Sequence, residues 1–203
     1  MNDLIVLVPD KNMEAAVGGI LDRSKSLGLR QVHHSIQIHP NRDPGCLGQG
    51  HDFLRSFAHS YRYGLILFDK EGCGREQESR EDLESQVEVR LRDSGWDDRA
   101  RTIVIDPELE VWVWSDSPHL SFALGWKGDL AELRRWLIEH QHWSEGRLKP
   151  DDPKAAMEEI LRLNKRPRSS SIYQQLTQKV SLQRCQDAAF LKLKAVLAEW
   201  FTA

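Results

Sequence analysis

The amino-acid sequence predicts an α/β fold: a mostly parallel central sheet flanked by helices, followed by a C-terminal helical extension. Two observations support this prediction. Short apolar runs, typical of buried strands, alternate with helical patterns up to about residue 145. Beyond that point the sequence shows helical patterns only. Parallel strands require crossover segments between them, because a tight hairpin cannot join them.

Four segments are expected to form the strands of the sheet. Leu4–Val8, Leu65–Phe68 and Thr102–Ile105 are continuous apolar runs, as found in parallel strands that are buried on both faces. Gln31–Ile38 alternates with a period of two, which is typical of a half-buried strand at the edge of a sheet.

Helices are expected between and after these strands. Asp10 is a suitable cap for the first, and Gly28 fits its exit. The later helices are predicted near residues 51–60, 76–93, 108–114, 130–140, 155–163 and 182–201. The stretch 39–50 holds two prolines and three glycines, which predicts a loop. Lys149–Pro153 is typical of a linker, so we expect an α/β domain at 1–145 and a helical C-terminal extension at 146–203.

The composition excludes several classes of protein. With 40% hydrophobic and 29% charged residues, the chain is typical of soluble globular proteins, and no apolar run approaches the roughly 20 residues that span a bilayer. The apolar start is too short for a signal peptide, so we expect a cytoplasmic protein with no membrane partner. Three cysteines without a CxxC spacing are expected to be free thiols. A net charge of −3 means that nucleic-acid binding would depend on a local basic patch.

Acidic side chains follow three of the predicted strands. They are Asp10 and Glu14 after the first strand, Asp69 and Glu71 after the third, and Asp106, Glu108 and Glu110 after the fourth. The carboxyl ends of parallel strands share one edge of the sheet, so these groups are predicted to meet there. Asp69 and Glu71 should face the same side of the extended chain while Lys70 points away. Two carboxylates about 5 Å apart repel by roughly 3 kcal/mol at an effective dielectric near 20, and a bound divalent cation would reverse this cost.

Oxygen-rich acidic sites suit Mg²⁺ or Mn²⁺, the ions that support phosphodiester hydrolysis. The turn Asp69-Lys-Glu71-Gly72 also resembles the Asp-x-Asp turn of the TOPRIM-like proteins of bacterial defence islands. Pro107-Glu-Leu-Glu110-Val-Trp112-Val-Trp-Ser-Asp116 is similar to a further pattern of that family, a proline followed by Glu-x-Trp and then Asp. The helical C-terminal part is similar as well, with Lys149-Pro150, Ser171-Ile-Tyr173 and the stretch from Leu182 to Leu197. The resemblance therefore covers most of the chain.

The resemblance implies a TOPRIM-like sheet and a component of a bacterial antiviral defence system, such as a methylation-associated one, with other defence proteins as partners. It implies a metal-dependent nuclease in which Glu14, Asp69 and Glu71 are catalytic. Mg²⁺ or Mn²⁺ would be held by Asp69, Glu71, Glu14, Asp10 and Glu110. The sequence departs from the family at Val8-Pro9-Asp10, where the family has glutamate directly after the strand. Asp10 or Glu14 would then supply this carboxylate.

Several readings of the same residues stay open. A TOPRIM-like module without catalysis could bind a partner protein or nucleic acid, and a phosphatase acting on small substrates is a third hypothesis. Glu110, flanked by apolar residues, could form a structural ion pair instead of binding metal. Nucleic acid would contact Lys11 and the basic run Lys165, Arg166 and Arg168, although a solvated linker would show the same composition.

Other motifs point away from alternative chemistries. The histidines between positions 33 and 51 fit no common zinc spacing. The sequence contains no P-loop, no GxGxxG and no Gly-x-Ser-x-Gly, which argues against a nucleotide-hydrolysing motor, a dinucleotide enzyme and a serine hydrolase.

Overall fold

The computed structural model describes residues 2–179 and 185–202. Its elements are β1 (Asn2–Val8), α1 (Lys11–Leu21), η1 (Ser24–Leu27), β2 (His34–Ile38), α2 (Arg42–Arg55), β3 (Tyr61–Asp69), α3 (Arg80–Leu91), η2 (Arg92–Trp96), β4 (Ala100–Ile105), α4 (Glu110–Val113), α5 (Pro118–Ala123), α6 (Leu130–Glu139), α7 (Pro153–Leu163), α8 (Ser170–Lys179) and α9 (Ala188–Phe201). The predicted start of the last helix at Leu182 lies outside the described residues. None of the described helices is long and apolar enough to cross a membrane.

Four strands form one sheet in the order β2-β1-β3-β4, and every pairing is parallel. This confirms the predicted α/β fold with a parallel sheet. The chain runs from β1 outward to β2 and then crosses to β3 on the other side of β1. The order of the strands therefore reverses between β1 and β3, and the crevice at their carboxyl ends is where open α/β sheets bind ligands.

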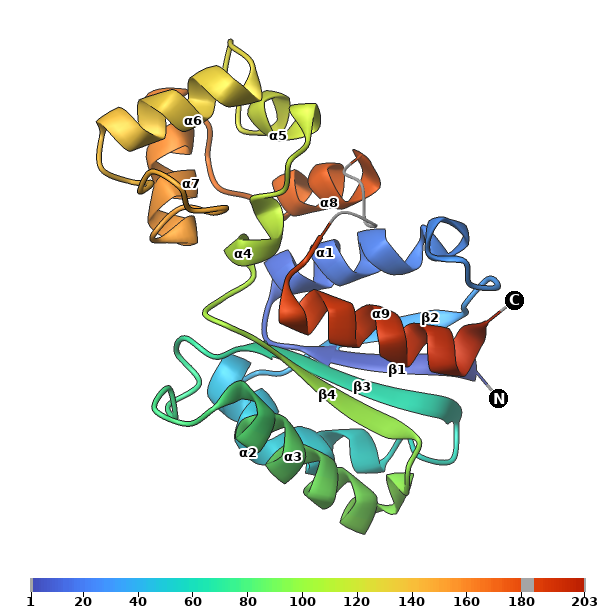
Figure 1. Cartoon of the computed structure of the whole chain (residues 1–203). Helices are drawn as coiled ribbons and strands as arrows, with labels where there is room; N and C mark the ends of the chain where they lie inside the picture. The colour runs from blue at the N-terminus through green and yellow to red at the C-terminus, as the bar shows by residue number, and fades with distance from the viewer. Residues whose placement is uncertain (1, 180–184, 203) are drawn as a thin grey trace.

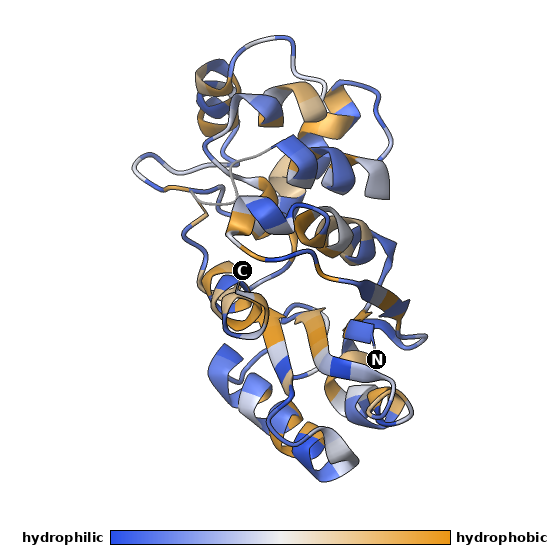
Figure 2. Ribbon diagram, turned by 90° about the vertical axis from the view of Figure 1, so that its right-hand side faces the viewer, coloured by the Kyte–Doolittle hydropathy of each residue, from blue (hydrophilic) through white to orange (hydrophobic). Residues whose placement is uncertain are grey.

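Helices cover both faces of the sheet. In Figure 1, α1 and α9 lie on one face, and α2 and α3 lie on the other. The alternation of side chains along each strand divides the core accordingly: Val6 and Leu67 pack toward α1 and α9, whereas Leu7 and Ile66 pack toward α2 and α3. Each of these helices carries hydrophobic and hydrophilic residues around its circumference (Figure 2), as expected where only one side of a helix is buried.

The helices α4 to α8, residues 110–179, form a helical cap that follows the carboxyl end of β4 (Figure 1). Its last helix, α8, packs closely against α1. At this crossing, a Cβ atom on Gly19 would lie 2.1 Å from Oγ1 of Thr177, so only glycine permits the approach. Arg23 also donates a hydrogen bond of 2.6 Å to the carbonyl of Thr177.

The structure differs from the sequence-based prediction at residues 39–50. The predicted loop is instead the beginning of α2, which starts at Arg42. Gly50 lies where this helix approaches the sheet: a Cβ atom on it would be 2.8 Å from Ile66 of β3. This glycine thus reflects close packing on the sheet, which outweighs its unfavourable helix propensity.

Charged side chains cap the free edge of β4. Glu84 and Glu88 of α3 accept hydrogen bonds from the backbone N–H groups of Val104 (3.0 Å) and Thr102 (2.9 Å). Lys192 of α9 donates to both carboxylates, at 3.0 Å each, and to the carbonyl of Thr102 at 2.9 Å. Side chains therefore satisfy groups that a fifth strand would otherwise pair, so this edge is not open to another chain. Glu84 is buried, although the charge-rich sequence around it predicts an exposed helix.

We predict that Lys192→Met lowers the free energy of unfolding by about 2 kcal/mol. The substitution removes the cation on α9 from the buried Glu84 and leaves it only Arg80 of α3, at 3.1 Å, among the described residues. Breaking one pair of a buried charge costs more than that pair contributes when intact. Urea unfolding followed by circular dichroism would measure the change. Lys194→Met, on the same helix and without an ion pair among the described residues, serves as the control. Equal losses in the two variants would contradict the role of Lys192.

A candidate acidic site at the carboxyl edge of the sheet

Three aspartates are placed at the carboxyl edge by three successive strand-to-helix connections. Asp10 follows β1 and caps α1, where its Oδ1 accepts the N–H groups of Asn12 at 2.9 Å and Met13 at 3.0 Å. Asp43 lies in the first turn of α2, after β2. Asp69 is the last residue of β3. The Oδ1 atom of Asp43 accepts the backbone N–H of Asp69 at 2.9 Å, so α2 is joined directly to the end of β3.

Asp69 lies at the centre of these charges. The residue is half-buried, but its Oδ1 atom is shut off from solvent and has no hydrogen-bond partner among the residues that the structure describes. Burial raises the pKa of Asp69 well above its usual range, and the neighbouring carboxylates of Asp43, Glu110, Glu108 and Asp10 raise it further. Burial also raises the pKa of Asp43. The end of β3 is therefore a place where negative charge is unfavourable in the absence of a cation.

The acids after β4 have cationic partners within the chain. The buried carboxylate of Glu110 accepts hydrogen bonds from Arg168 and from the hydroxyl of Tyr173. The other two acids are paired as well: Lys154 contacts Glu108 at 2.7 Å, and Lys70 contacts Asp106 at 2.9 Å. These ion pairs join the end of β4 to α7, to the entry of α8 and to the turn after β3.

The residues proposed to be catalytic are not all equivalent in the structure. Glu14 is half-buried in the first turn of α1, and Glu71 is exposed in the turn after β3. Neither belongs to the four carboxylates that raise the pKa of Asp69. The backbone N–H of Glu71 donates to the carbonyl of Pro107 at 2.9 Å, which holds this turn against the end of β4. Asp69 and Glu71 thus occupy different surroundings.

The four basic residues proposed to contact nucleic acid also differ. Arg168 is engaged with Glu110 and with Glu158 at 3.1 Å. Arg166 donates to the carbonyls of Phe122 and Ala123 at the end of α5, at 3.2 Å and 2.9 Å. Lys11 and Lys165 are exposed and have no ion pair in residues 2–179 or 185–202.

Sequence reasoning missed one carboxylate at this edge, Asp43. It lies, like His39, in the stretch predicted to be a loop. His39 follows β2, is buried, and accepts the N–H of Asn41 at its Nδ1 atom over 3.1 Å. A Cβ atom on Gly45 would collide with its ring, which shows how tightly the start of α2 encloses it. The acidic residue followed by proline at Asp43-Pro44 is a helix-start signal that could have identified α2 and its first-turn carboxylate.

The carboxylate oxygens of this edge are the kind of ligand that Mg²⁺ or Mn²⁺ prefers. The Oδ1 atom of Asp69, unpartnered among the described residues, could serve as such a ligand. Asp69, Asp43 and Asp10 are the residues that would hold the ion. Within the part of the chain that the structure describes, no three His, Cys, Asp or Glu side chains lie close enough together to form a ready-made metal site. Binding would therefore require these side chains to reorient around the ion.

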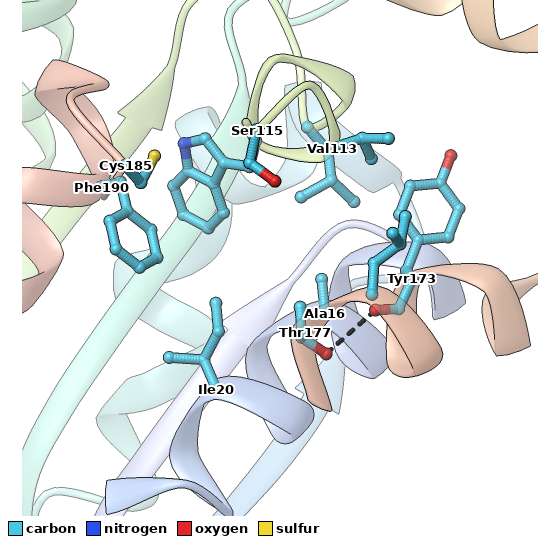
Figure 3. A pocket seen from close by; sticks show the side chains of 11 residues that line it. Ala16, Ile20, Val113, Ser115, Tyr173, Thr177, Cys185 and Phe190 are labelled. Carbon is cyan, nitrogen blue, oxygen red and sulfur yellow. Dashed lines mark hydrogen bonds between the residues drawn. The ribbon is translucent and has the colours of Figure 1, made fainter. Parts of the chain in front are cut away.

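A separate small cavity of about 30 Å³ lies between α1, α4, α8 and the start of α9, and Figure 3 shows its lining. The side chains of Ile20, Val113 and Phe190 make it largely apolar. The ring of Tyr173 lines the cavity, while its hydroxyl points away, toward Glu110. No acidic residue lines this cavity, so it is distinct from the acidic edge.

Comparisons with protein-family models, with curated proteins and with solved structures give no match to this chain. The geometry of the acidic edge therefore carries the functional argument.

We predict that Asp69→Asn stabilises the protein at pH 7 by about 1 kcal/mol, the scale of a single pKa unit. Because folding raises the pKa of Asp69 above 3.8, the native state binds more protons than the unfolded state between these two pKa values. Stability in the wild type therefore falls as the pH rises through this window, and the asparagine variant lacks that fall.

Urea unfolding between pH 4 and pH 8 would measure this difference. Asp93→Asn removes the charge of an exposed acid and should leave the pH profile unchanged. The raised pKa of Asp69 would be contradicted if Asp69→Asn were destabilising at pH 7. It would also be contradicted if the difference in free energy of unfolding between this variant and the wild type did not widen as the pH rises.

Proposed function

We propose that this protein is a divalent-metal-dependent phosphodiesterase that cleaves nucleic acid at the acidic edge of its sheet. One observation carries the proposal: the Oδ1 atom of Asp69 is unpartnered, lies at the reversal point of the strand order, and is surrounded by carboxylates that raise the pKa of its group. Perturbed acidic groups in such crevices are typical of functional sites. A divalent cation supplies an activated water and neutralises charge on the phosphate.

The residues of the edge have separate roles in this proposal. Asp69 is the principal ligand, because the end of β3 fixes its backbone and its Oδ1 atom has no other partner. Asp43 positions it through the hydrogen bond to its N–H group. Asp10 contributes charge from the start of α1, while Glu14 and Glu71 would approach from half-buried and exposed positions.

The sequence resemblance to TOPRIM-like proteins supports the same chemistry and suggests its setting. A parallel sheet with one acid after its first strand and another after its third agrees with that resemblance. On this basis we propose that the protein is a component of a bacterial antiviral defence system, acting in the cytoplasm with other proteins of that system.

The test is cleavage of labelled DNA and RNA with Mg²⁺ or Mn²⁺. We expect cleavage by the wild type and at least a 100-fold lower rate for Asp69→Asn, a loss comparable to removing one electrostatic group from an active site. Mn²⁺ should also raise the melting temperature of the wild type, by an amount that grows with its concentration, and leave that of Asp69→Asn nearly unchanged.

Asp93→Asn is the matched control and should cleave at the wild-type rate. Equal product from the wild type and Asp69→Asn would refute the catalytic role. Mononucleotides tested beside the polymers separate a nuclease from a phosphatase.

The ion pairs after β4 favour a second candidate, a module that binds partners without catalysis. Arg168 neutralises Glu110 and Lys154 neutralises Glu108, so half of the acidic edge is already balanced. Pro9 also stands where the family has its glutamate. In this case purification from cells should retain a stoichiometric partner protein. Mn²⁺ should then shift the melting temperature of neither the wild type nor Asp69→Asn. Isolation as a lone monomer would count against this candidate.

A further inference from the structure

The helical cap has a surface groove that shares no residue with the acidic edge. Its volume is about 570 Å³. Trp126, Lys127 and Gly128 form one wall, α6 forms the other, and Asn164 at the end of α7 closes one side. Residues 132, 135, 136 and 139 of α6 line it, a spacing that places them on one face of the helix.

Aromatic rings form the apolar part of this groove. The centroids of Trp126 and Trp136 lie 5.8 Å apart, and both residues are half-buried and pack against the main core. The imidazole of His140 stacks on Trp136 with centroids 3.8 Å apart and planes only 17° apart. His140 itself is exposed. The groove therefore offers the aromatic surface of Trp126 and Trp136, and His140 adds an exposed ring beside it on which a further planar ring can stack.

Cations without acidic partners surround these rings. Lys127 and Arg135 line the groove, are exposed, and have no ion pair within the described ranges. Lys165, which directly follows Asn164, is also exposed and has no ion pair in the described residues. Next to it, Arg166 reaches Gly125 and, in the described part of the chain, binds backbone carbonyls and no acid.

Two acids of the described residues line the groove, and one of them is already engaged in a helix cap. Glu132 accepts the N–H of Asp129 at 3.0 Å and completes the capping box of α6. Glu139 is exposed and has no ion pair in the described residues. The lining itself carries two acids and two bases, and Lys165 and Arg166 beside it make the charge around the groove positive, although the whole chain carries a net charge of −3.

We infer that this groove binds single-stranded nucleic acid, with bases stacked on the aromatic rings and phosphates against Lys127 and Arg135. Stacking on protein rings requires unpaired bases, and exposed cations beside such rings are the usual complement of a phosphate backbone. The inference rests on the proposed function for its class of ligand. It adds a second contact, in the helical cap, that would hold a strand while another part of it reaches the acidic edge.

The test is fluorescence anisotropy of labelled single-stranded oligonucleotides, DNA and RNA, titrated with the full chain in EDTA. Without a divalent cation, binding is measured independently of cleavage. The double variant Lys127→Ala/Arg135→Ala should bind roughly 10-fold more weakly, and its slope of log affinity against log salt should be shallower by about 1.4, because each phosphate contact of a single strand changes the slope by about 0.7. Glu139→Gln should bind a few-fold more tightly, because it removes the available acid.

The matched control is Lys25→Ala/Arg62→Ala, which removes one lysine and one arginine from exposed positions elsewhere. It should bind like the wild type. Equal weakening in the two double variants, tighter binding of duplex than of single strands, or no binding by the wild type at low salt would overturn the inference. Trp136→Leu supports the stacking role if affinity falls while thermal stability is kept.

The two proposals can fail separately. If the wild type does not cleave but binds single strands through Lys127 and Arg135, the groove stands and catalysis is excluded. If it cleaves while both double variants bind alike, the acidic edge stands and the groove is excluded.

Discussion

The structure depends on one constraint: all strands of a parallel sheet end at the same edge. Each connection from strand to helix in this chain places an acid there, at Asp10, Asp43, Asp69 and, after β4, Glu108 and Glu110. Mutual repulsion would favour dispersal, but the parallel pairing of apolar strands and the burial of both faces of the sheet hold the connections in place. Packing of the core thus imposes the electrostatic problem at the edge.

Cationic side chains neutralise these acids on one side of the edge, after β4. After β4, cations from more distant parts of the chain neutralise the acids: Arg168 pairs with Glu110 and Lys154 pairs with Glu108. The free edge of β4 is treated in the same way, since Lys192 of α9 balances Glu84 and Glu88. Asp69 has no such cation within residues 2–179 and 185–202, and the hydrogen bond from Asp43 reaches only its N–H group. The negative charge that lacks a cationic partner therefore lies at the carboxyl ends of β1 and β3.

The sequence was sufficient for the features that local patterns determine. Apolar runs identified three of the strands and a period-two alternation identified the fourth, and Asp69 could be placed at a sheet edge because it directly follows one of the apolar runs. Asp43 was missed because glycines and prolines indicate a loop, whereas here Gly50 allows α2 to approach the sheet. The ion pair of Glu110 was one of two readings, and the choice depended on Arg168, which is 58 positions away in the sequence. Contacts over such separations depend on tertiary packing.

The lack of a cationic partner for Asp69 in the described residues also bears on the choice between the two candidate functions. A carboxylate whose pKa is raised by burial and by like charges reduces stability at neutral pH, and a single change to asparagine would relieve it. Groups that destabilise a fold in this way concentrate at functional sites, where the strained arrangement is needed for binding or catalysis. A module that only binds partners through its surface has no use for an unpartnered oxygen at the end of β3. The ion pairs after β4 reduce the number of available ligands, but the unbalanced group itself, Asp69 with Asp43 and Asp10, favours a cation-binding centre over a degenerate one.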